Sequence, residues 1–348
     1  MHYKHSLKAV LRTRDLSLIW GLTTASVACH DFEAGSWRSA DAGGGAAGQP
    51  TSSTSANGGA GAPPNADAQA GTAGTGALGG SMSGPGAGGE AVEPLEPSAI
   101  EGLTLWLTAG KEWCSEVANH EVTSWTDRSS HHNDAKERRG VARPKYLEIT
   151  LTGHPSLRFE AAPSNLVVPD HRSLRFGEGD FAYVVVARLR NDPQPAYDAH
   201  GEVIYAGSGS ILSKLEAPAP HRGIAMFANY PTPDHGSQAY RRLAVQLSLG
   251  GVLTLSYTDR VNDDVFRVYT ARRKAGSDIE IRINGEPEGR SMISGALDVS
   301  AEGSDLLIGG WGIQPFAGDI SEIVALRGSI DDRQLAGLER GLLEKYRL

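Results

Sequence analysis

A 54-residue window from Ser39 to Val92 limits where this chain of 348 residues can fold. The window holds 16 Gly, 14 Ala and 10 Ser or Thr, and it contains no aromatic residue and no Lys or Arg. So few apolar side chains cannot offset the cost of ordering the backbone, about 1–2 kcal/mol per residue. We therefore predict a disordered tether over residues 29–96, in which the window alone spans about 40 Å, and a folded domain over residues 97–348.

Charge and cysteine content exclude several classes of protein. The net charge of −8 argues against a nucleic-acid-binding protein, which needs a basic face to displace counterions from phosphates. Two cysteines are too few for a disulfide-rich scaffold or for a metal site built from several cysteines. Only 4 of the 23 aromatic residues precede position 96, so the core must form in the C-terminal part of the chain.

The N-terminal segment has the pattern of a secretory signal peptide over residues 1–28. Its apolar run from Leu16 to Ala28 is too short to span about 30 Å of hydrocarbon. The small residues before Cys29 resemble a bacterial lipobox, although Ser26 stands where a Leu-like residue is usual. This resemblance implies a lipid anchor at Cys29 and a place in the bacterial cell envelope, at the outer membrane or the surface. Ordinary signal-peptidase cleavage after Ala28, which gives a secreted protein, and a misassigned start are the alternatives.

Short runs of β-branched and aromatic residues recur through the C-terminal part, bounded by Gly, Pro, Asn and Asp. Runs such as Phe181–Leu189 predict antiparallel strands. The pairs Gly250-Gly251 and Asn284-Gly285 predict two-residue hairpin turns. One helix is predicted from Asp331 to Tyr346, with an Asp cap and apolar side chains on one face. The predicted fold is all-β: an antiparallel two-sheet jelly-roll sandwich with a short C-terminal helix.

Several short segments follow one another in the order and spacing of a known family. They are Gly102–Thr108, Val122–Ala135, Pro155–Phe159, Ile281–Glu286, Leu307–Gly310 and Phe316–Ile323. Together they resemble the concanavalin A-like lectin/glucanase superfamily, in its laminin-G-like bacterial branch. The resemblance covers about residues 100–348 and implies a jelly roll. Such folds host lectins, adhesive modules, glycosidases and spacers, so the fold does not name an activity.

Two groups of oxygen-bearing side chains are candidate Ca²⁺ ligands, because hard cations prefer carboxylate and amide oxygens. Calcium is common in the wider superfamily that the segments resemble. Asp and Asn also favour turns, where their side chains accept hydrogen bonds from nearby backbone N–H groups, and this alternative stays open. The first group is Asp127, Asn133 and Asp134, and the second is Asp259 and Asp263 with the adjacent Asp264. Adjacent His131 and His132 predict a polar turn rather than a zinc site.

Carbohydrate binding uses aromatic faces against sugar rings, with polar side chains reaching the hydroxyl groups. Loop aromatics among Gly and Pro are candidates for such contacts, and they can equally cover the sandwich core. By contrast, Trp106 and Trp125 lie in strand patterns and are expected in the core. The candidate ligand-binding residues are Trp311, Tyr230, Asp234, His235 and Tyr197.

Catalysis would need two carboxylates on either side of a glycosidic bond. Asp278 and Glu280 alternate on one strand, which is similar to the glucanase strand, but Ile283 stands where its third acid should be. A charge contact between Glu280 and Arg282 explains the pair equally well. We therefore expect a membrane-anchored surface module that binds carbohydrate or another surface ligand without catalysis and without a required cofactor. A polysaccharide-cleaving hydrolase and a purely structural or adhesive domain are the alternatives.

Overall fold

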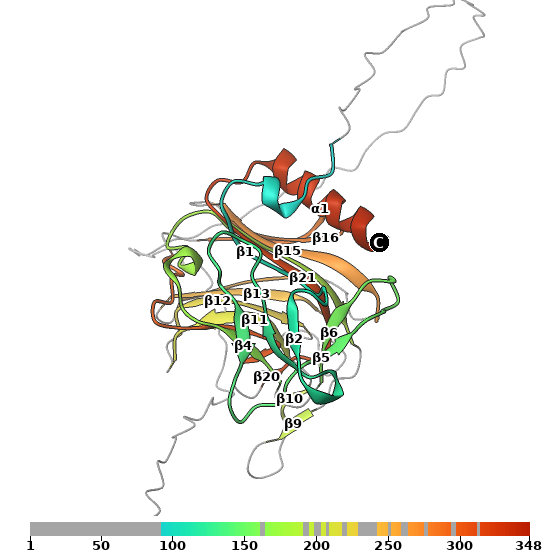
Figure 1. Ribbon diagram of the computed structural model, residues 1–348. Coiled ribbons are helices and arrows are strands. Elements are labelled where there is room, and N and C mark those ends of the chain that lie inside the picture. Colours follow the sequence, from blue (N-terminus) through green and yellow to red (C-terminus); the bar gives the residue numbers. More distant parts are fainter. Residues whose placement is uncertain are drawn as a thin grey trace, which may run out of the picture. The chain divides into compact units, whose positions relative to one another are not determined.

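The computed structural model describes residues 92–160, 164–190, 195–197, 203–206, 209–217, 221–228, 242–249, 252–258, 264–274, 278–293, 297–311 and 314–348. The predicted signal peptide, Cys29 and the tether as far as residue 91 lie outside these residues. Strands of the described part pair antiparallel in two main sheets, with one short helix near the C-terminus (Figure 1). The predicted all-β, two-sheet architecture is therefore confirmed.

One main sheet has eight strands, and its last strand in sequence lies in the middle. That strand, β21, pairs with β8 on one side, and on the other side with β6 at its start and β1 further along. In sheet order the strands are β17 (Glu286–Met292), β16 (Asp278–Ile283), β15 (Phe266–Lys274), β8 (Phe181–Leu189), β21 (Gly318–Arg327), β6 (Ser156–Phe159) and β5 (Lys145–Leu147), with β1 (Leu103–Thr108) beside β21.

The other main sheet has nine strands and packs against the first. Its order is β14 (Val252–Tyr257), β13 (Ala244–Leu249), β12 (Gly223–Ala228), β11 (Gly209–Leu215), β18 (Leu306–Ile308), β7 (Leu166–Val168), β4 (Ala135–Glu137), β3 (Val122–Trp125) and β2 (Cys114–Glu116). Two small ribbons pair β9 (Pro195–Tyr197) with β10 (Val203–Ala206), and β19 (Gly310–Trp311) with β20 (Gln314–Pro315). Three short 3₁₀ turns are η1 (Pro97–Ala99), η2 (Ala118–His120) and η3 (Arg172–Leu174).

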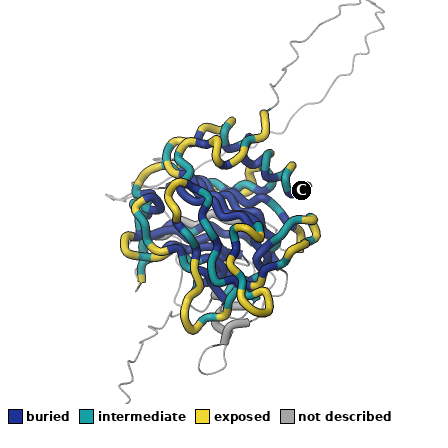
Figure 2. The backbone as a smooth tube through the Cα atoms, in the orientation of Figure 1, coloured by how far each residue is buried: buried dark blue, intermediate teal, exposed yellow. Residues whose placement is uncertain are grey.

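Strand β8 shows how one strand serves two apolar layers. Side chains alternate between the faces of a strand, so a strand covered on both sides becomes a continuous apolar run. Phe181, Tyr183 and Val185 belong to the cluster between the sheets, whereas Val184 and Val186 belong to the cluster beneath the helix. Figure 2 shows the buried strands at the centre and exposed residues along the loops.

The helix α1 (Asp332–Tyr346) covers the outer face of the eight-stranded sheet (Figure 1). The Asp331 carboxylate accepts a hydrogen bond from the backbone N–H of Gln334 at 2.6 Å, which is the expected N-cap. The residues that the sequence placed on one face are buried: Leu335, Leu338, Leu342 and Tyr346. The predicted helix and cap are confirmed. Among the described residues, no helix is both long enough and apolar enough to cross a bilayer.

The chain just before η1 lies along α1. The backbone N–H of Leu95 donates to the carbonyl of Gly337 at 2.9 Å, and Arg340 donates to the carbonyl of Val92 at 2.8 Å. A β-carbon at Gly341 would come within 2.5 Å of the Leu95 carbonyl oxygen, so only glycine allows this approach. The last residues assigned to the predicted tether thus pack against the helix.

Both predicted hairpin turns fit the observed registers. Leu249 pairs with Val252, so two residues connect β13 and β14. Asn284 and Gly285 have φ values of 51° and 85°, as a type I′ turn requires, and they connect β16 to β17.

A buried charge cluster joins the loop after β7 to the loop before β18. The Asp170 carboxylate accepts hydrogen bonds from Arg175 and, at 2.6 Å, from the ammonium group of Lys214. Lys214 is fully buried and also donates to the carbonyl of Ala301 at 3.0 Å, while the backbone N–H of Gly303 donates to Asp170 at 2.7 Å. The cluster fixes two loops that lie more than a hundred residues apart in sequence.

Candidate functional site

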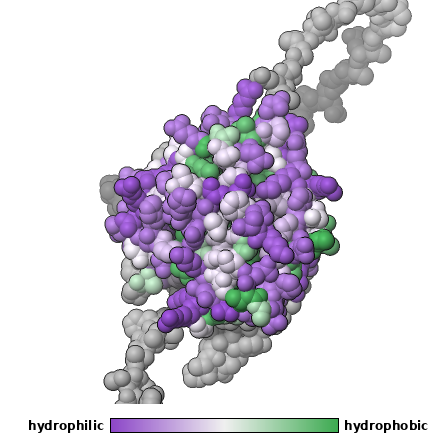
Figure 3. Space-filling view, in the orientation of Figure 1, coloured by the Kyte–Doolittle hydropathy of each residue, from purple (hydrophilic) through white to green (hydrophobic). Residues whose placement is uncertain are grey.

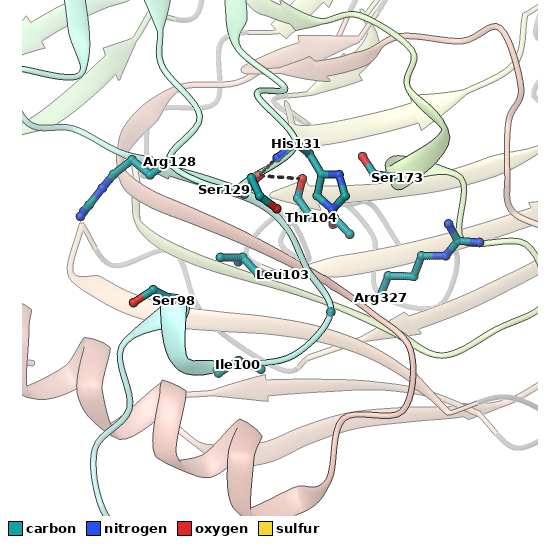
Figure 4. Close-up of a pocket in the computed structure, with 11 residues that line it drawn as sticks. Ser98, Ile100, Leu103, Thr104, Arg128, Ser129, His131, Ser173 and Arg327 are labelled. Atoms are coloured by element: carbon teal, nitrogen blue, oxygen red, sulfur yellow. Dashed lines mark hydrogen bonds between the residues drawn. The ribbon is translucent and has the colours of Figure 1, made fainter.

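A pocket of about 530 Å³ opens between the start of β1, the loop after β3 and the end of β21 (Figure 4). Its volume lies within the range of about 300–1,000 Å³ that small-ligand sites occupy. We call it the β1–β21 pocket. It is lined by Ser98, Ile100, Gly102, Leu103, Thr104, Arg128, Ser129, Ser130, His131, Ser173 and Arg327.

The loop above the pocket is organised by one buried carboxylate, that of Asp127, which is 2% exposed. Its Oδ1 accepts from the backbone N–H groups of Trp106 at 2.8 Å and Ser129 at 2.9 Å. Its Oδ2 accepts from the backbone N–H of Asn133 at 2.7 Å and from the Ser129 hydroxyl at 2.6 Å. Four donors on one carboxylate hold the loop in a single conformation against β1.

Asn133 connects this loop to the wall formed by η3. Its side-chain Nδ2 donates to the carbonyl of Thr104 at 2.7 Å and to the hydroxyl of Ser173 at 2.9 Å. The Ser173 hydroxyl also lies 2.8 Å from Nδ1 of His171. Three separate segments of the chain therefore meet at fixed positions around the pocket.

Arg128 lies at one side of the pocket and is held by aromatic rings. Its guanidinium carbon is 3.5 Å from the ring centroid of Trp106 and 4.8 Å from that of Trp113. The Trp106 ring is fixed in turn, because its Nε1–H donates to the buried carboxylate of Glu322 at 2.6 Å. The contact with the Trp106 ring restricts the Arg128 side chain. The N–H groups in the plane of the guanidinium group remain able to donate to a ligand.

Arg327 is the last residue of β21, and it lies on the other side of the pocket (Figure 4). Its backbone N–H donates to the carbonyl of Gly102 at 2.8 Å, and its side chain donates to the carbonyl of Arg172 at 3.2 Å. Gly102 has φ +83°, and a β-carbon there would come within 2.1 Å of the Arg327 carbonyl oxygen. Only glycine permits this close approach, which places Arg327 at the pocket.

The lining is rich in hydroxyl groups and positive charge. Ser98, Ser130 and His131 are exposed at the pocket. The two arginines line opposite sides of it. No Asp or Glu side chain of the described part belongs to its lining. Within the described residues, neither Arg128 nor Arg327 forms an ion pair. Such a surface offers hydrogen bonds to hydroxyl groups and charge-assisted hydrogen bonds to anions.

The first predicted metal cluster lies directly behind this pocket. The structure brings Asp127, Asn133 and Asp134 together, and Asp134 accepts from the backbone N–H of Asp127 at 2.9 Å. The Asp127 and Asp134 carboxylates accept hydrogen bonds from backbone N–H groups and from the Ser129 hydroxyl, which is the arrangement that the turn alternative predicts. In the described part of the chain, no three His, Cys, Asp or Glu side chains are grouped to hold a metal. Asp259 and Asp263 lie outside that part.

Among the predicted ligand-binding residues, only Trp311 has a described side chain, and it does not line the β1–β21 pocket. Trp311 lies in β19, packs against a small cluster of Leu215, Ala225 and Phe227, and meets the His221 ring edge-on at 4.9 Å. Tyr197 lies in β9, but its side chain is outside the description. The remaining candidates, Tyr230, Asp234 and His235, also lie outside the described residues. As expected, Trp106 and Trp125 are buried.

The carboxylates considered for catalysis are paired with arginines. Asp278 contacts Arg290, and Glu280 lies 3.7 Å from Arg282, which confirms the expected charge contact. The one described thiol is equally unsuited to act as a nucleophile. Burial, with smaller contributions from the nearby charges of Glu116 and Glu112, raises the pKa of Cys114 to about 12.

No pattern in the sequence marked the lining residues Arg128, Ser173 and Arg327 together as a site. Arg128 lies inside the segment that resembles the family motif, next to the predicted ligand Asp127, so a local signal existed. For Arg327 there was none, because only the pairing of β1 with β21 brings it near residues about 200 positions earlier.

No protein-family model and no curated protein sequence matches this chain. Among solved structures, the binding domain of Paraclostridial Mosquitocidal Protein 1 matches with a TM-score of 0.50 at 12% identity, over 70% of this chain and 52% of that chain. The receptor binding domain of botulinum neurotoxin D gives a TM-score of 0.48 at 9% identity, over 70% and 53%. The binding domain of botulinum neurotoxin DC in complex with SialylT gives 0.47 at 10%, over 69% and 51%. The chain spans about half of each, and the first likeness shows the fold alone.

Proposed function

We propose that this chain is a carbohydrate-binding module of the concanavalin A-like, laminin-G-like type, and that it binds its ligand in the β1–β21 pocket without catalysis. The observation that carries the proposal is the lining itself. Hydroxyl groups, one imidazole and two guanidinium groups converge on a pocket of about 530 Å³. A ligand rich in hydroxyl groups can bind the exposed Ser98, Ser130 and His131 and the two guanidinium groups, whereas an apolar ligand would leave these groups without a partner.

Two further features favour binding over hydrolysis. A glycosidase needs two carboxylates facing the scissile bond, and no Asp or Glu side chain lines this pocket. On β16, Glu280 and Asp278 lie beside arginines, as outer-face charges do. The face seen in Figure 3 is mostly hydrophilic, which suits a partner recognised through polar groups.

The proposed module is displayed at the bacterial surface by a lipid on Cys29 and by the small-residue tether that follows it. The lipobox-like residues before Cys29 and the composition of the window support this part of the proposal. In this arrangement the acyl chains hold the protein at the membrane, and the tether lets the sandwich stand away from it.

Binding to a panel of polysaccharides tests the function. The full chain is incubated with neutral and acidic polymers, with and without Ca²⁺, and both retention and the release of reducing ends are measured. We expect retention of at least one polymer without release of reducing ends. Release that disappears in Glu280→Gln would establish the hydrolase alternative, and no retention of any polymer would leave the structural or adhesive alternative.

A variant that blocks the β1–β21 pocket tests whether the polysaccharide binds there. Ser98→Trp places a large ring at an exposed lining position and should abolish retention. Ser115→Trp is the matched control, because Ser115 is exposed on the edge strand β2 and does not line the pocket. Equal retention by both variants would place the binding elsewhere on the molecule.

Fractionation tests the anchor separately. Cys29→Ser should move the full chain from the membrane fraction to the soluble fraction, since the acylated side chain is lost. Unchanged fractionation would reject the lipoprotein assignment and leave the binding function unaffected.

A further inference from the structure

Two arginines give the β1–β21 pocket its positive charge. Several other arginines lie within 4 Å of a carboxylate, as Arg158 and Arg188 do with Asp319, and Arg282 does with Glu339. Arg128 and Arg327 line the pocket and have no such partner in the described part. The Asp127 carboxylate behind the pocket is turned to backbone N–H groups, so it does not neutralise them directly.

We propose that the pocket selects an acidic polysaccharide, one whose sugar units carry a carboxylate or a sulfate ester. This proposal rests on the proposed carbohydrate-binding function and narrows its ligand class. Planar guanidinium groups donate two parallel hydrogen bonds to a carboxylate or sulfate, and such charge-assisted bonds are about twice as strong as neutral ones.

The two arginines stand on opposite sides of the pocket (Figure 4). The ring of His131 points to the side where Arg327 and the Ser173 hydroxyl lie, while Arg128 extends on the other side, which is also the side of Ser98 in this view. We expect a small anion to make fewer contacts than a polymer does, because the two guanidinium groups stand on opposite sides of the pocket. A chain with repeated acidic groups can contact both, with its hydroxyl groups facing the serines between them.

Arg128 is prepared for this role before any ligand arrives. Its guanidinium group is stacked on Trp106 and its backbone N–H donates to the Trp106 carbonyl at 2.8 Å. Little side-chain freedom remains to be lost on binding, which favours affinity. The whole chain carries a net charge of −8, so a polyanion gains nothing from the long-range field and must be held by local contacts.

Paired polymers test the proposal. The full chain is titrated with polygalacturonate and its carboxyl-reduced form, and with dextran sulfate and dextran. We expect at least one acidic polymer to bind about tenfold or more tightly than its neutral partner, since one charged hydrogen bond contributes about that much. Galacturonate monomer or inorganic sulfate should bind far more weakly than the corresponding polymer.

Variants of single arginines test which side chains cause the preference for acidic polymers. Arg327→Gln and Arg128→Gln should each reduce the preference for the acidic polymer about tenfold. Arg139→Gln removes the same charge at an exposed position that does not line the pocket, and it should leave affinity unchanged. Thermal unfolding of each variant confirms that the fold is retained.

The outcomes separate this proposal from the one on which it rests. Equal binding of acidic and neutral partners, with binding still blocked by Ser98→Trp, would overturn the selection of acidic sugars and keep the carbohydrate-binding module. A preference for the acidic polymer that survives both arginine variants would place the selecting site elsewhere and overturn the proposal. Binding of no polymer at all would reject both.

Discussion

Two loop regions of this molecule are each organised by one aspartate, the buried Asp127 and the half-buried Asp170, and they use it in opposite ways. Asp127 accepts only backbone N–H and serine hydroxyl donors, and it shapes the loop over the β1–β21 pocket. Asp170 accepts from Arg175 and from the fully buried Lys214, and it closes two loops onto each other. An aspartate thus shapes a loop beside a pocket in one region and forms a closed ion-pair cluster in the other.

The difference follows from the partner that each carboxylate takes. Where backbone N–H groups satisfy the carboxylate, nearby cations remain available to a ligand. Where cationic side chains satisfy it, their charge is neutralised within the fold. Stability and binding should therefore separate: the Asp170 cluster should matter more for stability, and the Asp127 loop more for the ligand.

Asp170→Asn should have the largest effect on stability. The variant leaves the buried ammonium of Lys214 without a compensating charge, and removing one partner of a buried ion pair costs about 3–5 kcal/mol. Urea unfolding followed by Trp fluorescence measures the loss. The double variant Asp170→Asn/Lys214→Met should recover part of it. A loss below about 1 kcal/mol, the level of an exposed ion pair, would contradict the comparison.

Acid titration of the unfolding free energy is a second test of the ion pair between Asp170 and Lys214. Burial alone would raise the pKa of Asp170, but hydrogen bonds from Arg175 and Lys214 outweigh it and lower the pKa to about 2. The folded pKa lies below the ordinary value of about 3.9, so the ionised form adds stability above about pH 4. This contribution disappears as the pH falls towards 2. The gap between wild type and Asp170→Asn should therefore narrow over that range, and a constant gap would count against the ion pair.

Asp127→Asn should have an intermediate effect on stability and the larger effect on binding. The amide NH₂ would face donors that now approach a carboxylate oxygen, and each buried donor left unpaired costs about 1–3 kcal/mol. We expect a loss of about 2 kcal/mol in the free energy of unfolding, together with loss of polysaccharide retention. Retention at the wild-type level would show that the loop does not shape the binding site.

Arg128→Lys should have the smallest effect. The charge is kept, but the planar stacking on Trp106 is lost, which corresponds to about 0.5–1 kcal/mol. The change should appear as altered Trp fluorescence and a slightly lower unfolding midpoint. If the unfolding free energy falls as far as in Asp127→Asn, Arg128 has a structural role that its contacts do not indicate.

Local signals in the sequence were sufficient for much of the fold. Asp331, with leucines at helical spacing after it, located α1, and Asn284-Gly285 located the β16–β17 turn because few residue pairs accept two positive φ angles. The run of β-branched and aromatic residues from Phe181 to Leu189 indicated the strand β8. Each of these depends on residues close together in the chain.

The candidate site was less accessible to this reasoning. Asp127 and Asn133 were identified as polar and close together, but residue type alone does not distinguish a metal ligand from an acceptor of backbone hydrogen bonds. Arg327 contributes through the pairing of β21 with β1, and a register between strands so far apart leaves no local pattern. The aromatic residues chosen as sugar contacts were selected by their turn-rich surroundings, and such surroundings do not reveal which surface a side chain faces.

The position of β21 has a consequence for how the protein is made. It lies between β8 and the pair β6 and β1, yet it begins only at Gly318, near the end of the chain. A nascent chain that emerges N-terminus first cannot complete the eight-stranded sheet, the β1–β21 pocket or the sheet face that α1 covers until β21 is available. The other seven strands of this sheet are synthesised earlier, so their synthesis and the completion of the sheet are separated in time.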